Sequence, residues 1–150
     1  MLIGSAASAD QKKETLMTAR ASGSFDVKIS QQGEPSKAEG IALGRMLLDK
    51  QYHGDLEATA HGEMLTVMTD VKGSAVYVAV ERVTGSLGGR RGSFAMAHQG
   101  TMARGAQELT IIVVPDSGSG ELSGLSGSMK IEIVEGKHFY EFEYAFSPTP

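Results

Sequence analysis

The amino-acid sequence predicts an all-β domain that closes as an antiparallel up-and-down barrel of about eight strands. From residue 22 nearly to the C-terminus, short segments alternate apolar and polar residues, which is the period of a strand with one buried face. Gly, Ser, Pro and Asp separate these segments, and 19 of the 150 residues are glycine, so the chain turns often. Short links without intervening helices favour a meander of hairpins over Greek-key crossings.

The predicted strands follow one another closely along the chain. In the first, Phe25, Val27 and Ile29 alternate with polar residues, and a turn is predicted at residues 33–40. Further strands are predicted at residues 42–52, 55–60, 64–69, 75–87, 92–102, 109–114, 128–134 and 138–146. Residues 64–71 also fit a helical stripe, so a helix is the alternative to the strand predicted there.

One domain accounts for most of the chain, because 150 residues suit a single hydrophobic core. We expect a flexible or partly helical extension over residues 1–21, the barrel over residues 22–146 and a tail over residues 147–150. Residues 1–8 lack the basic and apolar stretches of a secretory signal. No apolar run reaches the roughly 20 residues of a membrane span. We therefore expect a cytoplasmic protein that does not enter a membrane.

Composition excludes several classes of function. A net charge of -4 with only 14 Lys and Arg residues argues against nucleic-acid binding, which needs a basic surface. The absence of cysteine excludes disulfides, thiolate metal sites and thiol nucleophiles. The four histidines show no HxH or HExxH spacing, and the glycines of residues 118–127 lack the strand and helix that flank a phosphate-binding loop. We therefore predict neither a metal nor a cofactor.

A predicted hairpin over residues 76–102 indicates which residues face the interior. Its turn lies at Gly88-Gly89-Arg90-Arg91, and a loop of Gly89-Arg90 or of all four residues places Leu87 opposite Gly92. The same register places Glu81 opposite His98, Val83 opposite Met96 and Phe94 opposite Gly85.

Glu81 and His98 are the candidate catalytic residues, because this register points both into the barrel within hydrogen-bonding reach. Burial and mutual attraction act in opposite directions on their protonation, which is how proton-transfer groups are tuned. The alternative is a buried pair that only fixes strand register.

Six further residues are candidates for ligand binding. An apolar interior with a few polar groups suits a small molecule, although the same aromatic residues could simply fill the core. Lys50 ends a strand together with Tyr52 and His53, so these three could line the barrel mouth or merely be polar residues at a strand end. The six candidates are Tyr77, Phe94, Met96, Tyr140, Tyr144 and Lys50.

The opposite face of the predicted strand 75–87 carries Val76, Val78 and Val80. Three apolar β-branched residues on the outside of a barrel indicate a contact between subunits, and scattered surface valines are the alternative.

Two segments resemble a known family. The first has Tyr-Val-Ala-Val-Glu at residues 77–81, then Gly85, Leu87, Gly-Ser-Phe at residues 92–94 and His98. The second, Val-Pro-Asp-Ser-Gly-Ser-Gly-Glu-Leu-Ser-Gly at residues 114–124, is the more specific. On these residues the sequence resembles a bacterial family of domains of unknown function, over roughly Met17 to Phe146.

The resemblance implies a closed eight-stranded meander barrel similar to that of plant allene oxide cyclase, and no established activity. That cyclase binds an unsaturated fatty-acid epoxide in an apolar cavity with a carboxylate near the reacting end, and Glu81 is comparable with that carboxylate by analogy of fold. Related barrels associate into dimers or trimers, so the resemblance also implies a homo-oligomer.

Two functional hypotheses follow. In the first, the barrel binds a small, largely apolar molecule, with isomerase or cyclase chemistry at Glu81 and His98 as an extension of that hypothesis. In the second, the barrel is packed solid and the protein is a non-catalytic oligomer or interaction module.

Overall fold

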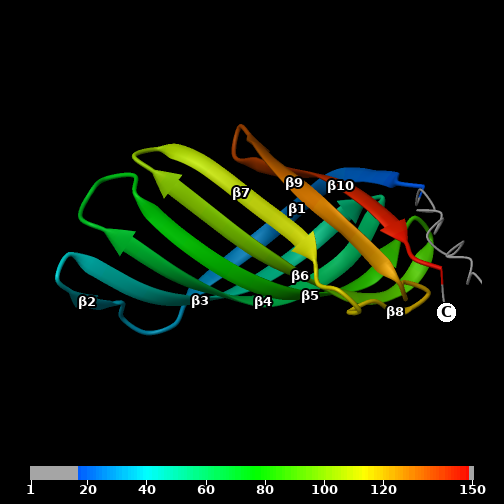
Figure 1. Ribbon diagram of the computed structural model, residues 1–150, viewed down its shortest axis with the longest axis horizontal. Helices are drawn as coiled ribbons and strands as arrows, with labels where there is room; N and C mark the ends of the chain where they lie inside the picture. The colour runs from blue at the N-terminus through cyan, green and yellow to red at the C-terminus, as the bar shows by residue number, and fades with distance from the viewer. Residues whose placement is uncertain (1–16, 149–150) are drawn as a thin grey trace, which may run out of the picture.

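The computed structural model describes residues 17–148, which form a single ten-stranded sheet without a helix (Figure 1). Within this range there is accordingly no helix able to cross a membrane. The strands are β1 (Ala19–Gln31), β2 (Ser36–Ala38), β3 (Ile41–Gly54), β4 (Leu56–Thr69), β5 (Ala75–Leu87), β6 (Arg90–Ala103), β7 (Ala106–Val113), β8 (Ser119–Gly120), β9 (Leu125–Val134) and β10 (Lys137–Phe146).

Eight of these strands close into an antiparallel barrel in the order β1-β10-β9-β7-β6-β5-β4-β3, and β3 pairs with β1 to complete the circle. The two short strands are additions: β2 pairs with β3, and β8 pairs with β6. Strands that follow one another along the chain lie side by side around the barrel. The predicted closed antiparallel meander is therefore confirmed.

The strand β4 is continuous, whereas the sequence analysis predicted two strands at residues 55–60 and 64–69. The residues between them include Gly62. In the structure Gly62 is an inward position of β4, and a Cβ added there would lie 2.3 Å from the carbonyl oxygen of Val80 and 2.9 Å from the Cβ of Glu81. This glycine thus permits close approach of β5 and does not end the strand.

The hairpin between β5 and β6 has a different register from the predicted one. Its loop is Gly88-Gly89, both residues have positive φ angles of 56° and 85°, and Leu87 pairs with Arg90. Two glycines provide the two positive φ angles of a tight hairpin turn, which Arg90 would adopt only under strain.

The two-residue error in register alters each predicted cross-strand pair. Glu81 lies opposite Met96, Val83 opposite Phe94, and Gly85 opposite Gly92, while His98 lies opposite Ala79. Because the shift is an even number of residues, every side chain keeps its predicted face.

The barrel begins earlier than predicted. β1 starts at Ala19, which pairs with Tyr144, so residues 19–21 belong to the sheet and not to the predicted extension. The helix or flexible arm predicted before them falls largely on residues 1–16, which lie outside the described residues. At the other end, β10 stops at Phe146 as predicted.

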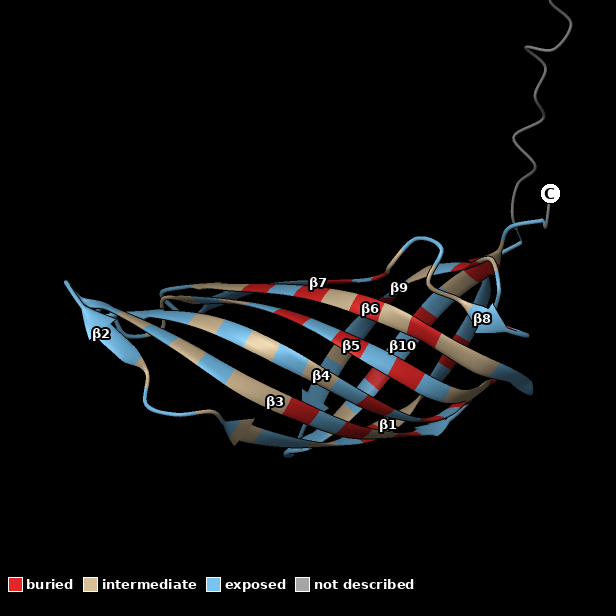
Figure 2. Cartoon of the chain, turned by 90° about the horizontal axis from the view of Figure 1, so that it is seen from below, coloured by how far each residue is buried: buried red, intermediate tan, exposed pale blue. Residues whose placement is uncertain are grey.

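The packed core occupies one end of the barrel, toward the right of Figure 2, where the buried residues gather. Phe94 and Phe142 stack with their ring centroids 5.9 Å apart, and Tyr52 meets Tyr140 edge to face at 5.6 Å. At the other end, which we call the open end, inward positions remain exposed: Met68 is 58% exposed and Ile133 63%. The barrel is therefore filled at one end and apolar but uncovered at the other.

After β7 ends, residues 114–124 run alongside β6 and form hydrogen bonds with it. Ser117 receives a hydrogen bond from the backbone N–H of Ala95, and Ser119 and Gly120 pair with Ser93 and Gly92. Leu122 from this segment is 1% exposed within the core. By contrast, β7 and β9 share a single ladder pair, Ile112 with Ser128. The segment that carried the most specific family resemblance thus seals the packed end of the barrel.

Tyr140 is a structural bridge at the packed end. Its hydroxyl donates to the carbonyl oxygen of His53 at 2.8 Å and accepts from the backbone N–H of Leu56 at 2.9 Å. We predict that Tyr140→Phe lowers the free energy of unfolding by about 1–3 kcal/mol, because one buried and one partly buried backbone group lose their partner. Urea denaturation at neutral pH measures this loss.

Tyr144→Phe is the matched control, since the Tyr144 hydroxyl makes no such bridge within residues 17–148. Its expected cost is below about 0.5 kcal/mol. Equal losses in the two variants would contradict the structural role of the Tyr140 hydroxyl.

Candidate functional site

Four polar side chains meet inside the barrel. Glu81 on β5 accepts a hydrogen bond from the Tyr52 hydroxyl at 2.5 Å through Oε1 and one from Lys50 Nζ at 2.7 Å through Oε2. His98 on β6 places Nε2 at 2.9 Å from the same Oε2. Glu81, Lys50 and His98 are 3%, 9% and 5% exposed, so the cluster is shielded from solvent.

Small residues on β4 allow this cluster to form. β4 lies between β3 and β5, so Lys50 must reach across it to meet Glu81. The inward residues of β4 at this level are Ala60, which pairs with Lys50, and Gly62, which pairs with Glu81. Any larger side chain at these two positions would occupy the space that the lysine side chain crosses.

The ionisation of Glu81 follows from opposing effects. Burial raises the pKa of the Glu81 carboxyl, but the contacts with His98 and with the ammonium of Lys50 lower it more, so that its pKa falls to about 2. Burial raises the pKa of Tyr52, and the adjacent Glu81 carboxylate raises it further. The cluster at neutral pH therefore contains a carboxylate and a neutral phenol that donates to it.

His98 is the incompletely satisfied member of the cluster. Nε2 lies 2.9 Å from Oε2 of Glu81 without forming a hydrogen bond to it, and it has no other hydrogen-bond partner among the described residues. A buried polar atom without a partner is costly, and functional sites are one place where such atoms occur.

Tyr77 lies on the open-end side of the cluster. Its ring covers Gly100 so closely that a Cβ added to that glycine would come within 2.1 Å of Cε1 of Tyr77. Burial raises the pKa of Tyr77, and the Glu81 carboxylate contributes to the same rise. Tyr77 thus stands between Glu81 and the exposed inward residues of the open end.

The other candidate residues lie elsewhere along the barrel. Met96 is opposite Glu81 and 0% exposed, and Phe94 belongs to the packed end, as does Tyr140. Tyr144 is half-buried between Phe142 and Phe146. Of the six predicted ligand-binding residues, the structure thus gathers Lys50, Tyr77 and Met96 around Glu81 and His98.

The three residues predicted at the barrel mouth point to different faces of β3, because successive side chains of a strand alternate in direction. Lys50 and Tyr52 face inward and join the cluster, whereas His53 faces outward and pairs with Asp26 at 3.0 Å. The contact of Lys50 and Tyr52 with Glu81 was not predicted from the sequence. The alternation of Leu48, Lys50 and Tyr52 on one face, opposite small residues on the next strand, was the signal that could have done so.

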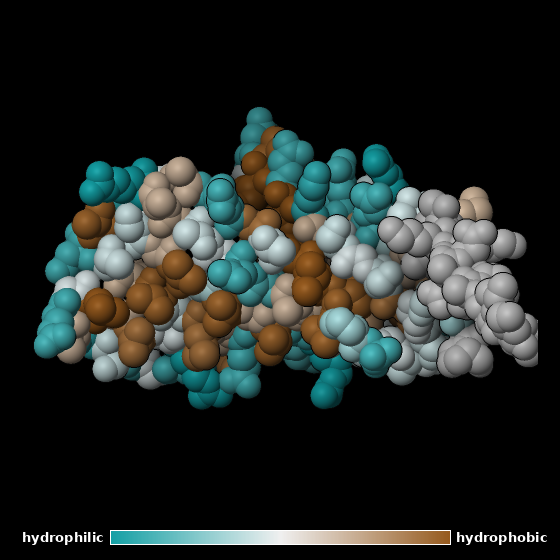
Figure 3. All heavy atoms as spheres, viewed as in Figure 1, coloured by the Kyte–Doolittle hydropathy of each residue, from teal (hydrophilic) through white to brown (hydrophobic). Residues whose placement is uncertain are grey.

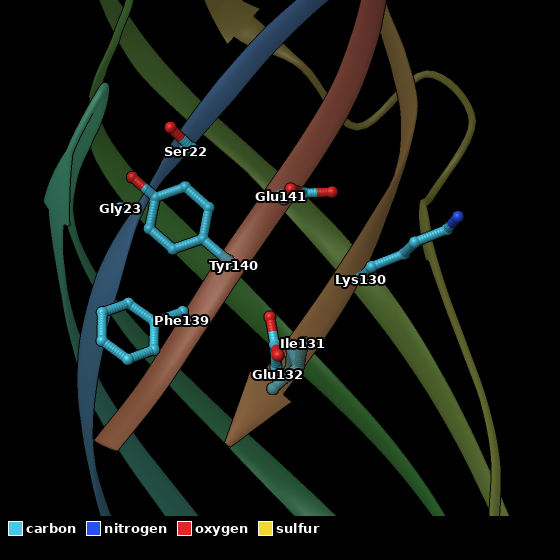
Figure 4. Close-up of a pocket in the computed structure, with 8 residues that line it drawn as sticks. All are labelled: Ser22, Gly23, Lys130, Ile131, Glu132, Phe139, Tyr140 and Glu141. Atoms are coloured by element: carbon cyan, nitrogen blue, oxygen red, sulfur yellow. The ribbon is translucent and has the colours of Figure 1, made fainter. Parts of the chain in front are cut away.

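Two hollows are present on the outside of the barrel. One, of about 580 Å³, lies over β1, β10 and β9, and its lining is mixed, with Lys130, Glu132, Phe139 and Glu141 among the side chains (Figure 4). The other, of about 530 Å³, lies over β4–β7 and is mainly apolar. His98 is among the residues that line the second hollow, whereas Glu81, Lys50 and Tyr52 line neither. Among residues 17–148, no three His, Asp or Glu side chains gather as ligands for a metal ion.

Comparison with known proteins agrees with this architecture. Residues 21–144 match the family model described as a protein of unknown function (DUF3224). The chain belongs to the DUF3224 family. It is similar to a crystal structure of a DUF3224 protein of unknown function from Shewanella oneidensis MR-1, with 50% sequence identity and a TM-score of 0.84. That match covers 88% of this chain and 100% of the other.

A search of curated proteins found no match. The resemblance to a bacterial family of unknown function is confirmed, and so is the barrel. Neither comparison names an activity for a DUF3224 domain. The likeness to the allene oxide cyclase barrel stays a prediction.

The low pKa of Glu81 predicts acid sensitivity. The folded state holds the carboxylate more strongly than the unfolded chain does, so its stabilisation is complete above about pH 4.5 and is lost as the pH falls toward 2. We expect Glu81 to contribute about 3 kcal/mol to the loss of stability over this interval. Urea denaturation at several pH values, for the wild type and for Glu81→Gln, measures the difference.

Glu63→Gln is the control, because the Glu63 side chain is 53% exposed. It should leave the pH dependence close to that of the wild type. A Glu81→Gln variant with an unchanged acid dependence would show that Glu81 is not held as a carboxylate.

A double-mutant cycle tests the ion pair itself. Lys50→Met and Glu81→Leu should each cost about 3–5 kcal/mol, because each leaves a buried charge without its partner. The double variant removes both charges, so we expect it to be at least about 2 kcal/mol more stable than the sum of the single losses predicts. Additive losses would mean that the two side chains do not interact.

Proposed function

We propose that the barrel binds a small, largely apolar molecule at its open end, with a polar group of that molecule placed against the Lys50–Glu81–His98 cluster. The observation that carries this proposal is that a shielded charged cluster lies beneath an inward-facing, partly exposed apolar wall, with Tyr77 between them. We define the inner apolar wall by its residues on six strands: Ile29, Met46, Met64, Met68, Met102, Leu109 and Ile133.

The inner apolar wall has the composition of an adaptable binding surface. Four of its seven side chains are methionines, which are unbranched and polarizable and can fit apolar ligands of different shapes. Ile29 and Leu109 are 52% and 41% exposed although they lie on the inward face of their strands. An apolar molecule that covered them would remove this surface from water, which is favourable.

The cluster offers the polar contacts that orient a ligand. Nε2 of His98 has no hydrogen-bond partner among the described residues. The Lys50 ammonium has three N–H donors, of which one is donated to Glu81 at 2.7 Å and a second to the Tyr52 hydroxyl at 3.4 Å, so one is left for a ligand. Both groups favour a hydrogen-bond acceptor such as a carbonyl or carboxylate oxygen. Tyr77 has to rotate away from Gly100 for that acceptor to reach them.

The low pKa of Glu81 favours binding over catalysis. A carboxylate with a pKa of about 2 is a weak general base at neutral pH, because the best proton acceptors have pKa values near the working pH. We infer that Glu81 holds Lys50 and the Tyr52 hydroxyl in place and does not itself remove a proton from a ligand. Isomerase or cyclase chemistry is therefore the weaker part of the original hypothesis.

Adjacent residues of β4 provide a matched test of the binding site. Met64 faces the interior and Leu65, its neighbour, faces outward. We predict that 8-anilinonaphthalene-1-sulfonate, an apolar anion that fluoresces in apolar surroundings, binds the wild type, and that Met64→Asp weakens its binding at least about tenfold, because the new carboxylate places a like charge beside the sulfonate. Tyr77→Ala should strengthen the binding, because it uncovers the cluster. Fluorescence titration gives each affinity, and circular dichroism confirms that each variant is folded.

Leu65→Asp is the control and should leave the affinity within about twofold of that of the wild type. Loss of binding in Leu65→Asp with retention in Met64→Asp would place the probe on the outer surface and overturn the proposal. Absence of binding to both the wild type and Tyr77→Ala would also overturn it.

A further inference from the structure

The outer face of β3–β7 carries a continuous group of exposed apolar side chains. Figure 3 shows hydrophobic residues gathered over the half of the molecule into which these strands extend. Each member points away from the barrel and is between 37% and 59% exposed. We call this surface the outer apolar patch and define it by Leu43, Leu65, Val67, Val76, Val78, Val80 and Ile112.

Strand pairing makes the outer apolar patch contiguous. Val67 on β4 lies opposite both Leu43 on β3 and Val76 on β5, and Leu65 lies opposite Val78. Directly opposed side chains in a sheet have their Cβ atoms about 5 Å apart, so these residues touch or nearly touch. The patch is therefore one surface and not a set of scattered valines.

The surface of the patch has a groove between ridges of larger side chains, a shape that suits packing against a second sheet. The outer hollow of about 530 Å³ lies within it, and its floor includes the small residue Ala97. Ala97 pairs with Val80 on one side and with Ile112 on the other, so two ridges of larger side chains flank it. Ridges beside a groove on the same surface can interlock with those of an identical surface.

The charged border of the patch is also self-complementary. Arg45 and Glu63 form an ion pair beside Leu65, in which Nε of Arg45 donates to Oε1 of Glu63 at 2.8 Å, and both side chains are more than half exposed. When a two-fold axis relates two copies, the border of one copy can lie against the same border of the other. Adjacent opposite charges suit this arrangement, because each Arg45 can then face a Glu63. A membrane surface, in contrast, favours a basic border with aromatic residues.

The size of the patch fits an interface between two copies. Seven side chains at this exposure present on the order of 500 Å² of apolar surface, which is near the upper end of the largest patches on monomeric proteins. With the groove lining and the charged border included, the surface approaches the roughly 800 Å² that each partner buries in a standard interface.

We propose that two copies of this chain associate through the outer apolar patch as a symmetric dimer in which the sheets pack face to face. Leu65, Val78 and Val80 of each copy enter the groove above Ala97 of the other. The dimer leaves the inner apolar wall uncovered, because the two surfaces lie on opposite faces of the same strands. The proposal is therefore independent of ligand binding inside the barrel.

Sedimentation velocity of the full chain over a range of concentrations tests the dimer. We expect the wild type to sediment as a dimer and Val78→Lys to raise the dimer dissociation constant at least about 100-fold, because two lysines would be buried without partners. Val134→Lys is the control, since Val134 is an outward residue of β9 outside the patch and is 44% exposed, against 45% for Val78. It should sediment like the wild type.

A wild type that remains a monomer up to roughly 1 mM would overturn the proposal and assign the patch to another partner. A dimer that persists in Val78→Lys would likewise overturn it, since the contact would then lie elsewhere.

The absence of cysteine from the chain allows a second test that does not depend on tolerance of lysine. A single introduced cysteine can cross-link only to another copy. We expect Val78→Cys and Val80→Cys to form cross-linked dimers with a short bismaleimide, and Val134→Cys to remain uncross-linked. Equal cross-linking at all three positions, or none at Val78 and Val80, would contradict the proposed interface.

Discussion

The two-sided pairing of β1 is the constraint on which the rest of the structure depends. β1 pairs with β10 along its first half and with β3 along most of its length, and this second pairing turns an open sheet into a barrel. Gly23 allows the junction to close, because a Cβ there would lie 1.9 Å from the carbonyl oxygen of His53. Closure leaves no free edge at β1 and β3 and directs the inward residues of the eight strands toward one interior, which is packed at one end and uncovered at the other.

Closure also explains why a charged cluster exists in an otherwise apolar interior. A buried ion pair stabilises little relative to an apolar replacement, but each charge is costly without the other, so the pair specifies which strands must approach one another. Lys50 on β3 and Glu81 on β5 meet across β4 only where β4 carries Ala60 and Gly62. The cluster therefore helps to specify how β3, β4 and β5 are arranged, and it also provides polar groups near the open end.

The same strands present two different apolar surfaces. Met64 and Leu65 are neighbours on β4, yet one belongs to the inner apolar wall and the other to the outer apolar patch. Strands that are apolar on both faces normally lie between two layers of a protein. In the extended half of β3–β7 no layer of the described chain packs against either the inner or the outer face. Both faces therefore remain available for binding, and substitution of a residue on one face leaves the other face unchanged.

The sequence by itself determined the all-β class and the meander of hairpins. It also determined that Glu81, His98 and Tyr77 face inward and that Val76, Val78 and Val80 face outward. These properties follow from a period of two residues, which is local and survives an error of two residues in register. The contact of Glu81 with His98 was predicted from a register in which the two residues are opposite, and that register was wrong. The two residues are diagonal, and their side chains still meet because both face inward. Only the tertiary structure decided that Lys50 and Tyr52 complete the cluster, that Gly62 lies within a strand, and that Tyr140 bridges β10 to the β3–β4 turn. Each of these depends on contacts between residues far apart in the sequence, and no local pattern specifies which distant strand will lie beside another.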